Sequence, residues 1–206
     1  MRQLTAISAF LAVTVFLVST ADAQWGRRQA PRYQGLEMMG GAGLNMCMES
    51  GDASCDNVDP SAAIFLAAGY RFSALFGLYL DFNYGWFSVD RGDSPTTMQV
   101  MPTARFFGVL KGAEFFGGIG FGYSQYKITD GDFSRTWSSW TNLKLEVGGD
   151  IEISRNLYLG AAVEYVFNMN EMGKVCQESG GAEACGDNKG DIADALQILG
   201  FVKYRF

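Results

Sequence analysis

Hydrophobic and polar residues alternate with a period of two along most of the chain beyond residue 34. In the segment 156–169, every second residue from Leu157 to Met169 is apolar, and the positions between them include Glu164 and Asn168, with Val166 the clear exception. The segments 142–153 and 76–87 repeat this pattern. Successive side chains of a β-strand point to opposite faces, whereas a helix requires a period of 3.6. The pattern therefore predicts strands with one apolar and one polar face.

Eight segments of this kind follow one another, and the connections between them alternate in length. The predicted strands cover 35–47, 61–72, 75–88, 98–109, 113–127, 139–153, 156–169 and 194–206. The long connections are 48–60, 89–97, 128–138 and 170–193, and the three between them are short. This order is typical of an up-and-down barrel with tight turns at one end and long loops at the other. Pro102 fits poorly, since a proline inside a closed sheet calls for a bulge or a strand that begins near Thr103.

Alternation alone does not say which face points inward, and a soluble ligand-binding barrel has its apolar face inside. Three features favour the opposite orientation. Charged residues make up only 18% of the chain and concentrate in the loops. The polar faces are rich in glycine, which suits a narrow lumen. Aromatic residues gather at both ends of the apolar faces, as at two membrane interfaces. We therefore predict an all-β fold, a closed eight-stranded antiparallel up-and-down transmembrane barrel.

The first 23 residues have the features of a cleaved signal peptide. Met1-Arg2 is a positive start, residues 4–18 form an almost unbroken apolar run, and Ala21-Asp22-Ala23 fits a cleavage site after Ala23. A membrane anchor is the alternative, but a spanning helix needs about 20 apolar residues. We therefore predict a signal peptide at 1–23, a periplasmic lead-in at 24–34 and the barrel at 35–206, in an exported multi-pass protein.

Cysteine, histidine and net charge limit the possible chemistry. The chain has four Cys and no His, and its net charge is −6. Export permits disulfides, and close spacing favours Cys47–Cys55 and Cys176–Cys185 among three possible pairings. Without His or a Cys-x-x-Cys pair we expect no zinc site and no cofactor. An acidic chain without a basic cluster is a poor candidate for binding nucleic acid.

The last strand reads DALQILGFVKYRF, with Leu196, Ile198, Val202, Tyr204 and Phe206 on one face. It resembles the C-terminal signature by which bacterial outer-membrane barrels are recognised for assembly. Together with the strand count, it makes the chain similar to the OmpA/OmpX-type small barrels. The resemblance implies an outer-membrane location, contact with membrane lipid and lipopolysaccharide, and recognition of Tyr204 and Phe206 by the barrel-assembly machinery. Because the chain ends at this strand, we expect no peptidoglycan-binding domain after it.

The polar faces place charged residues in the predicted lumen, where they should pair in an ion-pair network because isolated charges there would be costly. This network comprises Glu37, Arg71, Asp81, Arg105, Glu114, Lys144, Glu146, Asp150, Glu152, Glu164, Lys203 and Arg205. The preferred interpretation is a stabilising network that fills the barrel, and a gate that passes small ions is the alternative.

The four long loops carry an excess of acidic residues, which favours solubility and contact with the lipopolysaccharide layer. Small outer-membrane barrels that are enzymes typically use a His-assisted nucleophile, and this chain has neither His nor a Gly-x-Ser-x-Gly motif. We therefore expect no enzyme. The leading hypothesis is a structural role in envelope integrity. An adhesin that binds an unknown extracellular ligand through its loops, and a minor pore or small-molecule transporter, are the alternatives.

Overall fold

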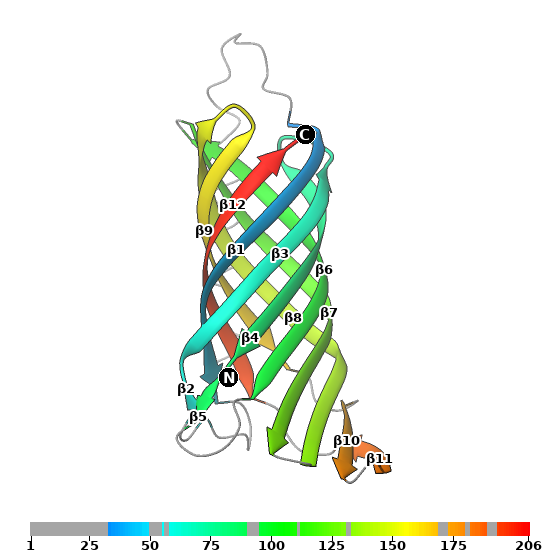
Figure 1. The fold of residues 1–206 in the computed structure, drawn as a ribbon. Helices are drawn as coiled ribbons and strands as arrows, with labels where there is room; N and C mark the ends of the chain where they lie inside the picture. The colour runs from blue at the N-terminus through cyan, green and yellow to red at the C-terminus, as the bar shows by residue number, and fades with distance from the viewer. Residues whose placement is uncertain are drawn as a thin grey trace.

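Eight long antiparallel strands close into a barrel in the computed structural model (Figure 1), which describes residues 33–49, 55, 58–89, 95–110, 112–130, 133–168, 173–179, 182–188 and 193–206. The strands are β1 (Gly35–Met48), β3 (Ser61–Arg71), β4 (Phe76–Trp86), β6 (Thr96–Leu110), β7 (Ala113–Asp130), β8 (Phe133–Ser154), β9 (Leu157–Phe167) and β12 (Asp194–Arg205). Each pairs with the next, and β12 also pairs with β1, so the sheet closes on itself. The predicted fold class is confirmed. Within the described residues, no helix is long and apolar enough to cross a membrane.

The short turns and the beginning and end of the barrel lie at one end of the molecule, here called the turn end. The start of β1 meets the end of β12 there, where the amide of Phe206 donates to the carbonyl of Leu36 at 3.0 Å (Figure 1). Two of the turns need a positive φ, which is +90° at Gly112 and +65° at Asn156. Glycine adopts this conformation without strain, and asparagine tolerates it better than most residues. The tight turns therefore follow from the local sequence.

The opposite end, here called the loop end, contains more regular structure than the sequence predicts. β7 and β8 continue as a hairpin through most of the predicted loop 128–138. Two short strands, β10 (Gly173–Ser179) and β11 (Ala182–Asn188), form a second hairpin that pairs with β8 and projects beyond the barrel (Figure 1). A further pair joins β2 (Val58–Asp59) to β5 (Ser88–Val89). The sequence prediction places these residues in loops, because the strands continue beyond the part of the wall that alternation marks.

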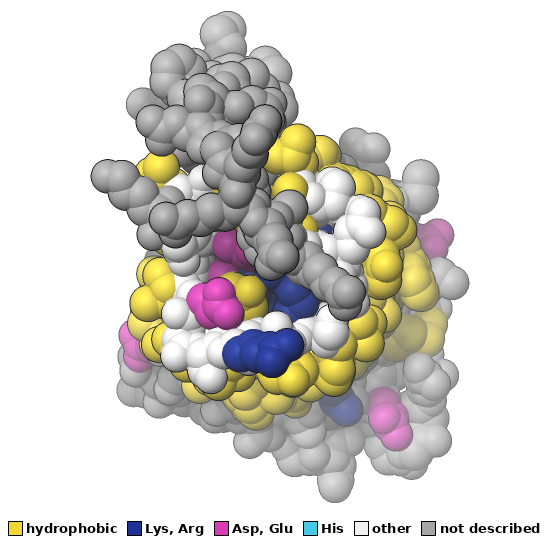
Figure 2. Space-filling model, turned by 90° about the horizontal axis from the view of Figure 1, so that it is seen from above, with side chains coloured by type: hydrophobic (Ala, Val, Ile, Leu, Met, Phe, Trp, Pro, Cys, Tyr) yellow, Lys and Arg dark blue, Asp and Glu magenta, His cyan; other side chains and the backbone are white. Residues whose placement is uncertain are grey.

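Apolar side chains cover the outside of the barrel wall, and charged side chains fill its inside. Leu66, Leu80 and Ile119 are about half exposed, whereas Glu37 and Lys144 are completely buried. Figure 2 views the turn end and shows this arrangement as an outer ring of hydrophobic side chains around acidic and basic ones. A water-soluble protein has the reverse distribution. The outer face is therefore suited to lipid and the inner face to charged and hydrogen-bonded groups.

Aromatic side chains form a band near each end of the outer face. At the loop end, ring pairs with centroids 4.5–4.9 Å apart are Tyr84–Trp86, Tyr123–Trp140 and Tyr165–Phe167. At the turn end, ring pairs 4.8–5.5 Å apart are Tyr70–Phe72, Phe76–Phe106 and Tyr204–Phe206. Such rings are favoured at the level of lipid headgroups. The two bands thus mark where the wall leaves the hydrocarbon.

Pro102 lies within a continuous strand and is not a strand boundary. β6 begins at Thr96, and its register with β7 is the same on both sides of the proline, from Val100 opposite Tyr123 to Thr103 opposite Gly120. The ladder to β7 is interrupted between these pairs, as expected for a residue without an N–H donor. The bulge falls instead on β8, where two residues lie opposite Tyr123 of β7 and the register between the two strands shifts.

We predict that an arginine on the outer wall destabilises the barrel according to its depth. Leu80 lies midway along β4, and Leu110 lies next to a tight turn; both side chains are more than half exposed. Leu80→Arg should lower the free energy of unfolding by about 2–4 kcal/mol, and the control Leu110→Arg by about 0–1 kcal/mol. Denaturant titration in lipid vesicles measures both values. Equal losses in the two variants would contradict the assigned orientation.

Candidate functional site

The turn end of the lumen holds a cluster of three acidic and three basic side chains, here called the lower cluster: Glu37, Arg71, Glu114, Asp150, Lys203 and Arg205. Glu114 lies at its centre and accepts hydrogen bonds from Arg71 at 2.8 Å, from Lys203 at 2.8 Å and from Arg205 at 3.0 Å. Lys203 also binds Asp150 at 2.7 Å, and Arg205 binds Glu37 at 2.6 Å. The charges in the lower cluster are therefore balanced, and each acidic group has a basic partner.

Tyrosine side chains complete the lower cluster. The hydroxyl of Tyr79 donates to Glu37 at 2.5 Å, and Arg205 donates to the hydroxyl of Tyr158 at 2.9 Å. Tyr33, which precedes β1, is buried with the guanidinium of Arg71 4.9 Å from its ring centroid. Burial raises the pKa of Tyr33, so its hydroxyl stays neutral near pH 7. The last residues before the barrel therefore belong to the packing of its turn end.

An apolar layer crosses the lumen next to the lower cluster, on the side that faces the loop end. It is formed by Met39, Phe65, Phe107, Phe116 and Phe201 with the ring of Tyr79. Phe116 touches both Phe107 and Phe201, with ring centroids 6.0 and 6.1 Å apart. A side chain at Gly148 would collide with Phe116, and one at Gly160 with Phe201. The inward glycines therefore make room for the rings that fill this section.

A second charged group, here called the central cluster, lies on the other side of the apolar layer and comprises Asp81, Arg105, Lys144, Glu146 and Glu164. The guanidinium of Arg105 donates to Asp81 at 3.1 Å and to Glu146 at 3.0 Å. Lys144 donates to Glu146 at 2.9 Å and also contacts Asp81. The members of the central cluster come from β4, β6, β8 and β9, so the cluster ties opposite parts of the wall together.

Glu164 makes the central cluster uneven. The ammonium of Lys144 lies 3.7 Å from one of its oxygens, and the amide of Asn83 donates to the other at 2.8 Å. The central cluster therefore contains three carboxylic groups and only two cations. Asn83 supplies a neutral donor where a third cation would otherwise be needed.

Uncharged polar residues occupy the lumen between the central cluster and the loop end. The side-chain amide of Asn45 donates to Thr97 at 3.3 Å and accepts from Gln197 at 3.4 Å. Met101, Val166 and Ala195 form a small apolar cluster in the same region. Val166, the exception in the alternation of its strand, is thus an inward residue that packs in this cluster.

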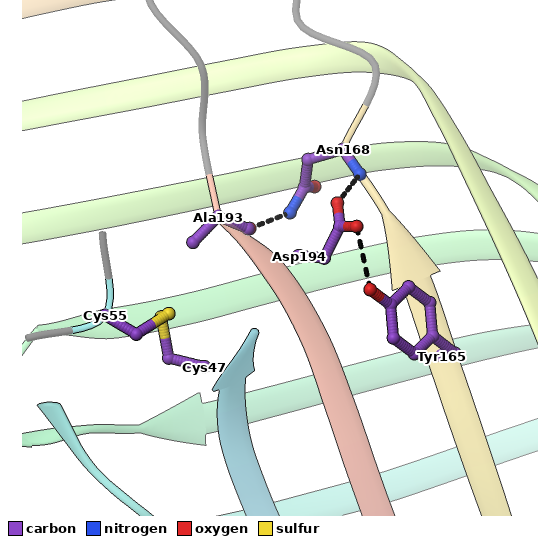
Figure 3. The surroundings of a disulfide bond; sticks show 6 residues. All are labelled: Cys47, Cys55, Tyr165, Asn168, Ala193 and Asp194. Carbon is purple, nitrogen blue, oxygen red and sulfur yellow. Dashed lines mark hydrogen bonds between the residues drawn. A yellow bond between two sulfur atoms is a disulfide. The ribbon is translucent and has the colours of Figure 1, made fainter. Parts of the chain in front are cut away.

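The mouth at the loop end is fixed by hydrogen bonds and a disulfide (Figure 3). Asp194 accepts from the hydroxyl of Tyr165 and from the backbone amide of Asn168, both at 2.9 Å. The bond Cys47–Cys55 joins the end of β1 to the first loop. The other disulfide, Cys176–Cys185, lies between directly opposed residues of the hairpin β10–β11. Each closes a short segment, which reduces the freedom of the unfolded chain.

Most of the sequence-predicted residues are where alternation places them, with one clear difference. The inward charged residues are buried in the two clusters, except Glu152, which is exposed. β8 shifts register between Glu152 and Ser154, where the wall ends and water reaches the side chains. Tyr204 and Phe206 lie exposed on the outer wall. The predicted cleavage site after Ala23 lies outside the described residues.

Two features of the lumen are absent from the sequence prediction. One is the apolar layer, and the other is the tyrosine–aspartate contact at the mouth. Consecutive aromatic residues could have revealed the first, because Phe106-Phe107 and Phe115-Phe116 each place one ring on either face of the wall. No local signal marks the second, since Tyr165 and Asp194 are 29 residues apart.

The chemistry available in the lumen is electrostatic. Its carboxylates are held by cations, amides or hydroxyls, and the chain has no His to act as a general base. Among the described residues, no group of three His, Cys, Asp or Glu side chains is placed to hold a metal ion. The arrangement is suited to holding charge in fixed pairs.

Comparison with solved structures shows the fold of small outer-membrane barrels. Neisserial surface protein A matches with a TM-score of 0.57 and 13% identity, over 84% of this chain and 97% of that one. OprG from Pseudomonas aeruginosa matches at 0.52 and 14%, over 84% and 98%. Ail of Yersinia pestis matches at 0.53 and 16%, over 84% and 99%. No family model and no curated protein sequence matches. The chain therefore has the eight-stranded outer-membrane barrel fold that its last strand and strand count indicate.

We predict that removing the Arg105 guanidinium strands buried carboxylates. Arg105→Met should lower the free energy of unfolding by about 3–5 kcal/mol, because Asp81 and Glu146 lose their main cation. Arg155→Met is the control, since Arg155 is exposed at a tight turn and should change stability by less than about 0.5 kcal/mol. Denaturant titration in vesicles compares them. A loss in Arg105→Met no greater than that in Arg155→Met would refute a stabilising role.

Proposed function

We propose that this protein is an integral outer-membrane barrel with a closed lumen and a structural role in the integrity of the cell envelope. The observation that carries this proposal is the filling of the lumen. The lower cluster, the apolar layer and the central cluster follow one another along the barrel axis. Phe107, in the apolar layer, has no exposed surface.

A closed lumen follows from the energy of these contacts. Any ion that passed along the axis would have to displace the rings of the apolar layer. It would also have to break hydrogen bonds between charged groups in both clusters. Removing one partner from a buried pair costs several kcal/mol. We expect the protein to be an anchor within the membrane, with an interior that stabilises its wall.

The outer surface supports the proposed location. Export through a signal peptide at 1–23 would bring the chain to the periplasm, and exposed Tyr204 and Phe206 at the end of β12 would serve the assembly machinery as its recognition signal. The aromatic bands would contact lipid headgroups. The acidic loops would face the lipopolysaccharide layer, where divalent cations can bridge carboxylates and lipid phosphates.

An adhesive role through the loops is the second candidate. The hairpin β10–β11 favours it, because it projects beyond the barrel and is closed by Cys176–Cys185. Ail has been solved with a heparin analogue, sucrose octasulfate. The loops of this protein carry exposed acidic residues, namely Glu49, Asp59, Glu178 and Asp187. Their negative charge would repel a sulfated ligand. An adhesin of this type would need an uncharged or basic partner.

The structural role predicts a silent channel and a leaky envelope when the protein is missing. Purified protein in planar bilayers should give no large, steady conductance. A strain that lacks the gene should take up the hydrophobic dye N-phenyl-1-naphthylamine faster, and the wild-type gene should restore the barrier. A control variant has its acidic loop residues replaced by the corresponding amides. Its dye uptake shows whether the barrier depends on contacts made by the loops. The proposal fails if bilayers show a stable open pore or if deletion leaves dye uptake unchanged.

A further inference from the structure

A cavity of about 300 Å³ opens at the loop-end mouth. It lies on the outer side of the uncharged polar layer and is separate from both ion-pair clusters. Its lining includes Cys47 of the disulfide, Phe87, Thr97 and residues from β7, β8 and β12. A volume of this size lies at the lower end of the range for small-molecule sites. The ion pairs that close the lumen do not explain this cavity, because none of their side chains lines it.

One side of the cavity is a continuous aromatic wall. The rings of Phe87 and Tyr126 are 6.1 Å apart between centroids, and those of Tyr126 and Trp137 are 5.6 Å apart. Val58 and Ile128 extend this apolar surface. Phe87 is buried even though it lies at the mouth. Three neighbouring rings offer an aromatic guest both edge and face contacts.

The cavity also contains hydrogen-bonding groups that can orient a guest. Ser124 lies in its lining, and its hydroxyl oxygen is buried without a hydrogen-bond partner among the described residues. Thr97 and Gln99 contribute further polar atoms to the lining. Buried polar atoms in proteins are usually paired, so an unpaired hydroxyl at a cavity wall favours a ligand with a hydrogen-bonding oxygen.

The surroundings select against anions and against strongly hydrated ions. Asp194 is the carboxylate of the lining, and the acidic loops around the mouth would repel an anion. A cation would compete for the rings with the guanidinium of Arg135, which already lies 5.1 Å from the ring centroid of Trp137. A strongly hydrated ion would also lose its water against the aromatic wall.

We propose that this mouth cavity binds a small uncharged aromatic molecule with a hydroxyl group, of the phenol class. The ring lies against Phe87, Tyr126 and Trp137, and the hydroxyl reaches Ser124. The floor is the uncharged polar layer, so the cavity holds its guest at the cell surface and does not pass it inward. This proposal adds a ligand to the barrel and does not depend on its role in the envelope.

The test uses the mature protein in lipid nanodiscs and p-cresol as the probe. Amide chemical shifts of Thr97, Ser124 and Ala195 should change with p-cresol concentration and reach saturation, and those of lipid-facing Ile198 should only follow partition into lipid. The anionic analogue p-cresyl sulfate should bind at least about tenfold more weakly. Shifts that never saturate, or equal binding of the two probes, would overturn the proposal.

Two pairs of variants separate occupation of the cavity from general damage. Ala195→Phe fills the cavity from β12, and its control Ile198→Phe adds the same ring to the outer wall three residues further along the strand. Trp137→Ala removes part of the aromatic wall, and its control Trp140→Ala changes a side chain that is 72% exposed on the same strand.

The cavity variants should weaken binding of p-cresol at least about tenfold, and the controls should stay within about twofold of wild type. Trp137 lies on the β7–β8 hairpin beyond the barrel wall, so its removal should leave the wall folded. Trp137→Ala therefore keeps the test decisive if Ala195→Phe fails to fold. Retained binding in folded Trp137→Ala, or an equal loss in Trp140→Ala, would overturn the assignment.

Discussion

Hydrocarbon cannot solvate a charge or an unpaired backbone amide, and this constraint shapes the whole barrel. A sheet can meet it only by closing, because an open edge would leave a row of unpaired groups in lipid. β12 closes the circle by pairing with both β9 and β1. Once the wall is closed and its outer face is apolar, every charged side chain within the lipid-covered part of the strands must point inward. Those charges are then buried, and each needs a partner across the lumen.

The interior meets that demand in layers. In the lower cluster, Glu114 is shared by three cations, so the loss of any member would affect several strands together. In the central cluster, Arg105 and Lys144 hold Asp81 and Glu146 between them. The apolar layer lies between the two clusters, and its rings contact Arg71 on one side and Arg105 on the other. Pairing of charge and packing of rings therefore act together, because ion pairs are stronger where water is excluded.

The outer architecture follows from the sequence because it depends on local alternation. The strands around Leu80 and Val163 each repeat apolar and polar positions, and the tight turns carry residues such as Gly112 and Asn156 that accept a positive φ. The inner architecture follows only in part. Alternation assigns Glu37 and Lys144 to the lumen, but it does not say that Glu37 meets Arg205, which is 168 residues away. Such pairs depend on how the strands are staggered around the barrel.

Two local features were beyond sequence reasoning for the same reason. Glu152 lies on a predicted inward position and keeps its register opposite Tyr158, but it is close to the end of the wall and its side chain is exposed. The mouth cavity is built from β6, β7, β8 and β12 together with residues near the ends of β1 and β4, and none of these segments signals it alone. Features that arise within one strand are therefore predictable, and features that arise between distant strands require the three-dimensional structure.

The orientation of the barrel requires that apolar side chains of the wall contact lipid while the lumen excludes it. Methyl NMR in nanodiscs that contain doxyl-labelled lipid measures this contact directly. We expect strong paramagnetic broadening of the methyl groups of Leu66, Leu80 and Val163, which are exposed on the wall. Val166 and Leu199, which are buried inside, should give sharp signals. Broadening of Val166 and Leu199 with sharp signals from the other three would contradict this orientation.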